Sequence, residues 1–158
     1  MHHPTAATDR LMTAHEATSP FARRAMAAVV SLGCAVVLGM AAFMTPSATG
    51  LGTHRQLNMP ECGWITIMDM PCMTCGMTTS FSHAVRGDFL RSFLAQPFGF
   101  VLALATAMAL IVSLHIALTG SQLAQPFARL WNARAAWLIA LFAAGAWIFK
   151  VLSYKGIA

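Results

Sequence analysis

The fold is decided by an apolar stretch near the N-terminus, which reads AMAAVVSLGCAVVLGMAAFM over residues 25–44. A transmembrane helix needs about 20 such residues, because the hydrocarbon core is about 30 Å thick and each residue rises about 1.5 Å. Two further stretches of this kind occupy residues 98–118 and 135–152. The second follows Pro97, which suits a first helical turn. The third contains Lys150, whose long side chain is expected to reach the membrane interface.

The composition supports the same class of protein. Of the 158 residues, 58% are hydrophobic and only 9% are charged, whereas about 25% are charged in an ordinary soluble domain. This excludes a soluble globular protein and a disordered chain. The formal charge of +5 is spread thinly, so we expect no nucleic-acid partner. The sequence therefore predicts an all-α membrane protein with three transmembrane helices, in contact with the lipid bilayer.

The remaining segments define the domain organisation. Residues 1–20 are polar and lack an apolar period, so they are predicted to form a disordered tail before a single membrane domain at 21–158. Arg23 and Arg24 directly precede the first apolar stretch. Positive residues beside the first helix favour the cytoplasmic side, so we expect a cytoplasmic N-terminus. The connection 45–97 then lies on the opposite side.

Two short helices are predicted late in this connection. Gly87 is suited to end the first and Asp88 to cap the second. Four apolar residues recur four positions apart and are expected to form one stripe: Phe81, Val85, Phe89 and Phe93. Such a stripe beside arginines suits a membrane surface. It would equally suit packing against the protein's own transmembrane helices.

The same connection holds three of the four cysteines, Cys62, Cys72 and Cys75. The C-x-x-C spacing of the last two allows them to form a disulfide or to share a metal ion. A metal site would use all three thiols and a fourth ligand, with His83 as the candidate beside His54 and Asp69. Such a donor set suits Zn²⁺ or Cu(I). Alternatively, Cys72 or Cys75 is a redox nucleophile, since the helix expected after Cys75 would lower its pKa.

An ordered set of residues around these cysteines resembles an uncharacterised family of small bacterial membrane proteins, the DUF2752 family of unknown function. The set comprises Cys62, Pro71, Cys72, Cys75, Gly76, Thr78, Gly87, Asp88 and Pro97. Two positions depart from the family pattern, because Thr79 replaces an arginine and Gln96 replaces an asparagine. The resemblance implies a multi-pass protein of the bacterial inner membrane, and it implies no activity.

Three hypotheses of function remain open at this stage. The first is a non-enzymatic membrane subunit that binds another membrane protein or itself, its loop locked by the C-x-x-C-G turn. The second is a metal-binding membrane protein, and the third is a membrane thiol–disulfide protein. The sequence contains no H-E-x-x-H or phosphate-binding loop, and this favours a non-enzymatic role.

Overall fold

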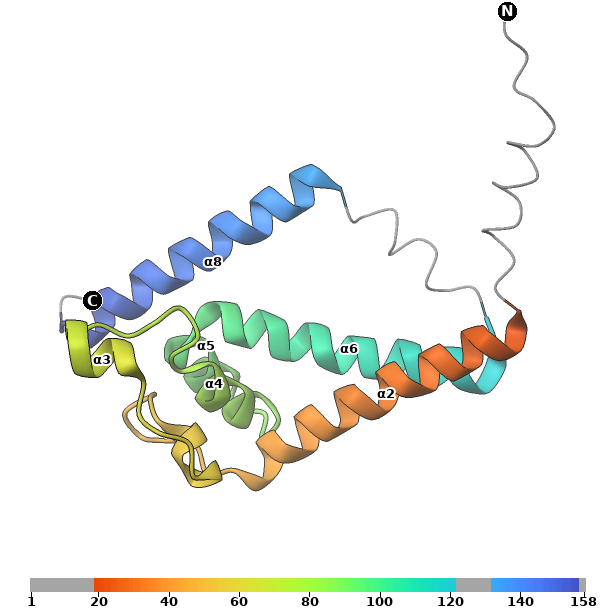
Figure 1. The fold of residues 1–158 in the computed structure, drawn as a ribbon, viewed down its shortest axis with the longest axis horizontal. Helices are drawn as coiled ribbons and strands as arrows, with labels where there is room; N and C mark the ends of the chain where they lie inside the picture. The colour runs from red at the N-terminus through yellow and green to blue at the C-terminus, as the bar shows by residue number, and fades with distance from the viewer. Residues whose placement is uncertain (1–18, 122–131, 157–158) are drawn as a thin grey trace, which may run out of the picture.

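The computed structural model describes residues 19–121 and 132–156, and within these ranges the chain is helical without a strand. The elements are shown in Figure 1. In chain order they are α2 (Pro20–Phe43), η1 (Thr53–Leu57), α3 (Gly63–Met68), α4 (Met77–Ala84), α5 (Phe89–Ala95), α6 (Pro97–Thr119) and α8 (Ala133–Tyr154). The tail expected over residues 1–20 lies almost entirely outside the described residues.

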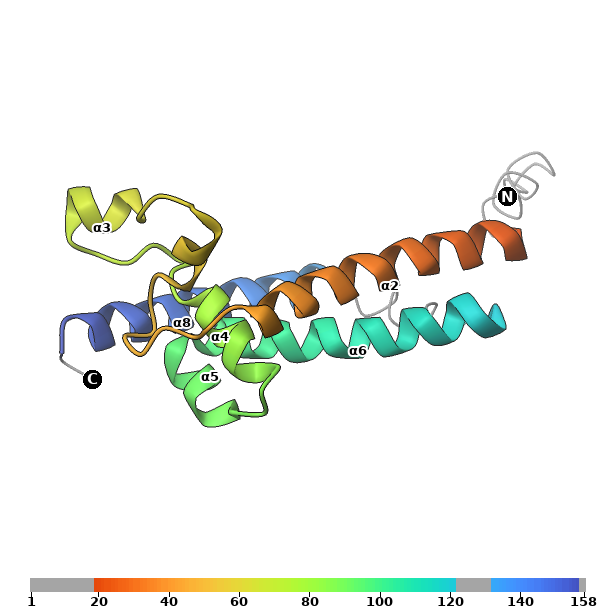
Figure 2. The same ribbon diagram turned by 90° about the horizontal axis from the view of Figure 1, so that it is seen from below.

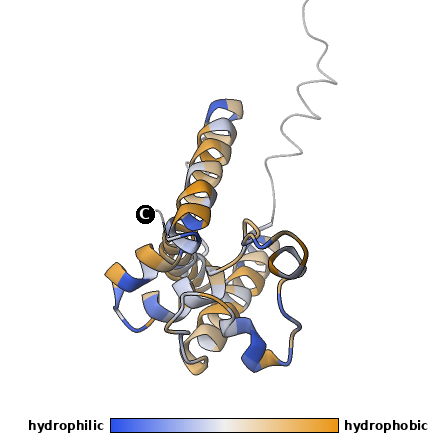
Figure 3. Ribbon diagram, turned by 90° about the vertical axis from the view of Figure 1, so that its left-hand side faces the viewer, coloured by the Kyte–Doolittle hydropathy of each residue, from blue (hydrophilic) through white to orange (hydrophobic). Residues whose placement is uncertain are grey.

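Three helices, α2, α6 and α8, are long and apolar enough to cross a membrane, which confirms the predicted all-α multi-pass class. Each begins earlier than its apolar stretch because a polar residue caps it. The side chains of Ser19, Gln96 and Asn132 each accept a hydrogen bond from the backbone N–H three residues later. Such caps satisfy donors that a helix leaves unpaired at its start. In Figure 3 hydrophobic colours cover most of the length of α8.

Helices α2 and α6 form an antiparallel pair (Figures 1 and 2), and arginines bind helix carbonyls at both of its ends. At one end Arg23 donates to the carbonyl of Gly120 at 2.6 Å, and Arg24 donates to that of Leu118 at 3.0 Å. At the other end Arg86 donates to the carbonyl of Ala42 at 3.0 Å. These carbonyls lie at helix C-termini, where they lack partners within the helix and where positive charge is favourable.

Helices α4 and α5 form a hairpin at the end of the α2–α6 pair, as the Gly87–Asp88 sequence predicts. Gly87 has a φ of +79°, and the Asp88 side chain accepts a hydrogen bond from the N–H of Arg91. The expectation of one continuous apolar stripe is wrong, because this turn reverses the chain between its two halves. Phe81 is buried against α2 and α6, whereas Phe93 of α5 is 43% exposed.

Helix α8 leaves the α2–α6 pair at an angle and meets the rest of the protein near its C-terminal end (Figure 1). Its contacts include the ring of Phe142 against Phe98 and two hydrogen bonds near the C-terminal end. Trp147 Nε1 donates to the carbonyl of Pro71 at 3.0 Å, and Lys150 Nζ donates to that of Gly50 at 3.2 Å. Lys150 is only 6% exposed, so its side chain does not extend freely along α8 but ends inside the protein, against the loop. We call this end of the bundle, which carries residues 44–96, the loop end.

Candidate metal centre

The three cysteines of the loop end come from two separate segments. Cys62 lies at the N-terminus of α3, while Cys72 and Cys75 belong to the turn between α3 and α4. This turn ends at Gly76, whose φ of +88° is in the left-handed region that favours glycine. A Cβ at Gly76 would lie 2.8 Å from the carbonyl oxygen of Ala95. Only glycine therefore allows the turn to approach the end of α5 so closely.

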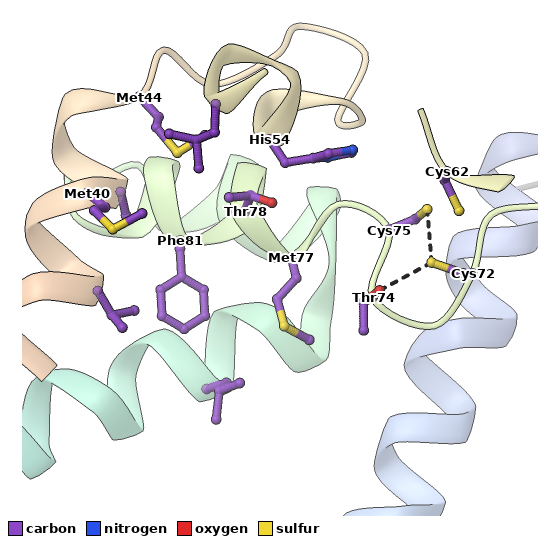
Figure 4. Close-up of a pocket in the computed structure, with 14 residues that line it drawn as sticks. Met40, Met44, His54, Cys62, Cys72, Thr74, Cys75, Met77, Thr78 and Phe81 are labelled. Carbon is purple, nitrogen blue, oxygen red and sulfur yellow. Dashed lines mark hydrogen bonds between the residues drawn. The ribbon is translucent and has the colours of Figure 1, made fainter. Parts of the chain in front are cut away.

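The structure brings the three sulfurs together. The Sγ atoms of Cys62, Cys72 and Cys75 all lie within 4.8 Å of one another, and all three cysteines are free thiols. Figure 4 shows Cys72 between Cys75 and Thr74, with its Sγ 3.2 Å from Cys75 Sγ and 3.2 Å from Thr74 Oγ1. We call these three residues the thiol cluster. It is partly buried, with Cys75 7% exposed.

An open, mainly apolar cavity of about 600 Å³ lies beside the thiol cluster, between the end of α2, η1 and α4. Thioethers line this cavity, from Met40 and Met44 of α2 and from Met77 of α4 (Figure 4). The imidazole of His54 also lines it and extends towards the cluster (Figure 4). The cavity beside the thiol cluster is therefore lined by soft sulfur atoms and by one imidazole.

The protonation of the cluster differs from one thiol to the next. Burial acts to raise the pKa of Cys62, but hydrogen bonds involving the Cys75 and Cys72 thiols outweigh it. The backbone N–H groups of Trp64 and Ile65 also favour the Cys62 thiolate, and together these hydrogen bonds lower its pKa to about 7. Cys62 therefore ionises more easily than an ordinary thiol.

Cys75 shows the opposite shift. Burial is the largest cause, and hydrogen bonds with the Cys72 and Cys62 thiols add to it, so that the pKa of Cys75 rises to about 12. The sequence led us to expect a lowered pKa for Cys75 from the dipole of the following helix. Burial outweighs that dipole, because burial disfavours the charged form of a thiol.

The two histidines that the sequence offered as a fourth ligand, His54 and His83, lie in different surroundings. His54 shares the cavity described above, and its Nε2 is 3.3 Å from the carbonyl oxygen of Pro60. His83 lies away from the thiols, since its Nδ1 is 3.5 Å from Asp88 Oδ2. The structure therefore does not bring His83 to the cluster with the cysteines.

Asp69 is likewise engaged elsewhere, with the C-terminal end of α8. It accepts hydrogen bonds from Lys155 at 3.3 Å and Tyr154 at 3.1 Å. The hydrogen bond from Lys155 is the main cause that lowers the pKa of Asp69, followed by the one from Tyr154. Together with the Trp147 and Lys150 contacts, these bonds attach α8 to the loop on both sides of the cysteine turn.

Sequence reasoning missed the roles of Trp147 and Lys150 in this attachment. Trp147 bonds the carbonyl of the residue directly before Cys72, and Lys150 lies beside Gly76, directly after Cys75. The sequence feature that could have indicated these roles is the position of both residues within an apolar helix. Polar groups there are costly unless they find partners inside the protein.

The remaining motif residues shape the loop end. Pro71 and Pro97 are buried, Thr78 lines the apolar cavity, and Gly87 and Asp88 form the turn between α4 and α5. The two departures from the family pattern are both buried. Thr79 Oγ1 is 2.7 Å from Thr53 Oγ1 and so joins α4 to η1. Gln96 caps α6 and donates to the carbonyl of Met73 at 3.2 Å.

Comparison with known proteins gives one match, over residues 62–110, to a family described as "Protein of unknown function (DUF2752)". This confirms the resemblance expected from the motif. The matched region begins at Cys62 and includes both other members of the thiol cluster, α4, α5 and the first part of α6. Neither the curated proteins nor the solved structures yielded a match.

Proposed function

We propose that the protein is a multi-pass membrane protein whose thiol cluster binds one soft metal ion. The cluster lies in the region, residues 62–110, that is similar to this uncharacterised family. The observation that carries the proposal is the convergence of three sulfurs within 4.8 Å. A zinc–sulfur bond is about 2.3 Å long, so two sulfurs on one tetrahedral ion lie about 3.8 Å apart. Small side-chain movements bring the three thiols to that spacing.

The donor set favours Cu(I) over Zn²⁺. In the described part of the chain the ligand atoms that converge are three thiols, without a fourth cysteine, histidine or carboxylate within the same distance. A structural zinc site requires four ligands, whereas Cu(I) accepts three thiolates and prefers soft sulfur donors. Thioethers of Met40, Met44 and Met77 line the adjacent cavity. Zinc would need His54 to approach as a fourth ligand.

The bound ion would hold the loop end in one conformation. The cysteine turn lies between the carbonyl that Trp147 contacts and the glycine that Lys150 contacts. An ion joining Cys62 to this turn would therefore fix the surface on which α8 rests. We infer a non-enzymatic role, in which this fixed loop end is presented to another membrane protein or to a second copy of the chain.

We further propose that the protein lies in the bacterial inner membrane with a cytoplasmic N-terminus, which places the thiol cluster on the periplasmic side. Arg23 and Arg24 at the start of α2 support this orientation. A membrane-impermeant maleimide added to intact cells should label Cys62. Labelling only after the cells are lysed would contradict the orientation.

The metal proposal is tested on the reduced full-length protein in detergent, loaded anaerobically with Zn²⁺ or Cu(I). We expect one ion per chain in the wild type and in C34S, because Cys34 lies in α2 outside the cluster. C62S, C72S and C75S should each lose stoichiometric binding. His54→Asn should weaken zinc binding while leaving Cu(I) binding intact. Wild-type protein that binds neither ion would overturn the proposal.

A second candidate function is favoured by the 3.2 Å separation of Cys72 and Cys75 Sγ. These two thiols are close enough to form a disulfide by exchange with an external disulfide, which would take up their two protons and two electrons as two thiols. Cys62, with its pKa lowered to about 7, would be the adjacent nucleophile. Thiol counting on anaerobically purified protein distinguishes the metal-binding function from the disulfide function. A disulfide between Cys72 and Cys75 leaves only Cys34 and Cys62 reactive.

A further inference from the structure

A second cavity, of about 630 Å³, lies at the loop end between residues 46–51, α5 and the end of α8. Its lining differs in chemistry from that of the thioether cavity. It includes three basic side chains and four hydroxyl side chains but no carboxylate: His83, Arg91, Lys150, Ser47, Thr49, Ser153 and Tyr154. Basic side chains and hydroxyl groups therefore line one partly open space.

Lys150 is the buried member of this lining. It is 6% exposed, and its Nζ donates to the carbonyl of Gly50 at 3.2 Å. Within residues 19–121 and 132–156, it forms no ion pair with a carboxylate. A buried ammonium group is costly unless an opposite charge compensates it. An anion in the cavity that Lys150 lines would supply that charge.

Arg91 and His83 are oriented by a carboxylate that does not line the cavity. Asp88 Oδ2 lies 3.5 Å from Arg91 Nε and 3.5 Å from His83 Nδ1, and its Oδ1 caps α5. The pair uses the Nε group of Arg91, and among the described residues no acceptor is bonded to its two terminal nitrogens. Those nitrogens form the part of the guanidinium that suits a bidentate contact with a phosphate.

The cavity lies at one end of the membrane-spanning helices, where lipid headgroups are expected. This is the end at which α8 ends and α6 begins. Leu94 lines it and is 53% exposed, and Leu90 on the same helix is 70% exposed. A phosphate group could therefore bind among the basic residues while acyl chains contact α5.

We propose that this cavity binds a phosphate group, held by Lys150 and Arg91 and by the hydroxyls of Ser47 and Ser153. The phosphate is that of an anionic phospholipid headgroup or a free phosphate ion, which share this chemistry. The lining of this cavity shares no residue with the thiol cluster.

The test uses delipidated full-length protein in detergent and phosphate-free buffer, with thermal unfolding followed by tryptophan fluorescence. The probes are phosphatidylglycerol, phosphatidylcholine and inorganic phosphate, each titrated separately. A ligand that binds only the folded protein raises the unfolding midpoint with concentration. We expect phosphatidylglycerol to raise it and phosphatidylcholine not to. An equal effect of inorganic phosphate would assign the site to the free ion.

Three variants make the result specific. Lys150→Met and Arg91→Met should each require about tenfold more probe for the same shift, the effect of losing one charged contact of about 1.4 kcal/mol. Lys155→Met is the control, because Lys155 pairs with Asp69 and does not line the cavity. Arg91 is exposed, so its variant decides the question even where Lys150→Met fails to fold. No shift with either anionic probe, equal shifts with both lipids, or an unchanged Arg91→Met titration would overturn the proposal.

Discussion

The close packing of the cysteine turn predicts that Gly76→Ala strongly destabilises the protein. Gly76 has a φ of +88°, and an alanine Cβ would lie 2.8 Å from the carbonyl oxygen of Ala95 and 2.9 Å from that of Gly50. The left-handed conformation costs about 1–2 kcal/mol for a residue with a Cβ. Overpacking against backbone atoms adds about 1–3 kcal/mol. The expected loss is therefore about 2–5 kcal/mol in the free energy of unfolding.

Gly87→Ala is the matched control for this prediction. Gly87 has a similar φ of +79°, but nothing lies within 4 Å of the position that its Cβ would take. It should lose only the conformational part, about 1–2 kcal/mol. Both variants are compared with the wild type by titrating a denaturing detergent into mild micelles and following tryptophan fluorescence. Equal losses in the two variants would refute the claim that the turn is packed tightly against Gly50 and Ala95.

Three further predictions follow from single contacts. Gln96→Ala should lower the free energy of unfolding by about 2–4 kcal/mol in the same titration, because α6 loses its cap and the Met73 carbonyl loses a partner. A loss below about 1 kcal/mol would contradict this prediction. Trp147→Phe should cost about 1–3 kcal/mol, since it leaves the carbonyl of buried Pro71 unpaired, and unchanged stability would show that this bond does not hold α8. In metal-free protein, mass spectrometry should show that Cys62 is alkylated before Cys75, because only the thiolate reacts. The alkylation rate of Cys62 should rise as the pH passes about 7. Faster alkylation of Cys75 would contradict the pKa shifts assigned to the two thiols.

Much of the fold could be predicted from the sequence, because a membrane imposes a fixed helix length. The three apolar stretches each became a long helix. The Gly87–Asp88 pair also predicted the α4–α5 turn, since both residues act locally on the backbone. By contrast, η1 and α3, of 5 and 6 residues, are too short for an apolar period to predict them. The contact that holds η1 is long-range, between Thr53 and Thr79.

The candidate site was only partly predictable, because some of its contacts are local in sequence and others are long-range. The spacing of Cys72 and Cys75 is local, so it indicated a pair of adjacent thiols. The approach of Cys62 depends on how α3 turns back towards them, which no short pattern encodes. His83 was a candidate for the fourth ligand, yet the α4–α5 turn brings it to Asp88. The partner of Lys150 could not be predicted either, because the Gly50 carbonyl that accepts its hydrogen bond lies 100 residues earlier in the chain.

The central claim is that the thiol cluster binds a metal ion through three sulfurs, and X-ray absorption at the metal edge tests it most directly. The full-length protein is loaded with Cu(I) or Zn²⁺ in detergent, and C62S and C34S are treated in parallel. The account predicts a shell of three sulfurs at about 2.3 Å in the wild type and in C34S. C62S should lose one of these sulfurs or the ion itself. A shell of only nitrogen and oxygen, or the same sulfur shell in C62S as in the wild type, would contradict it.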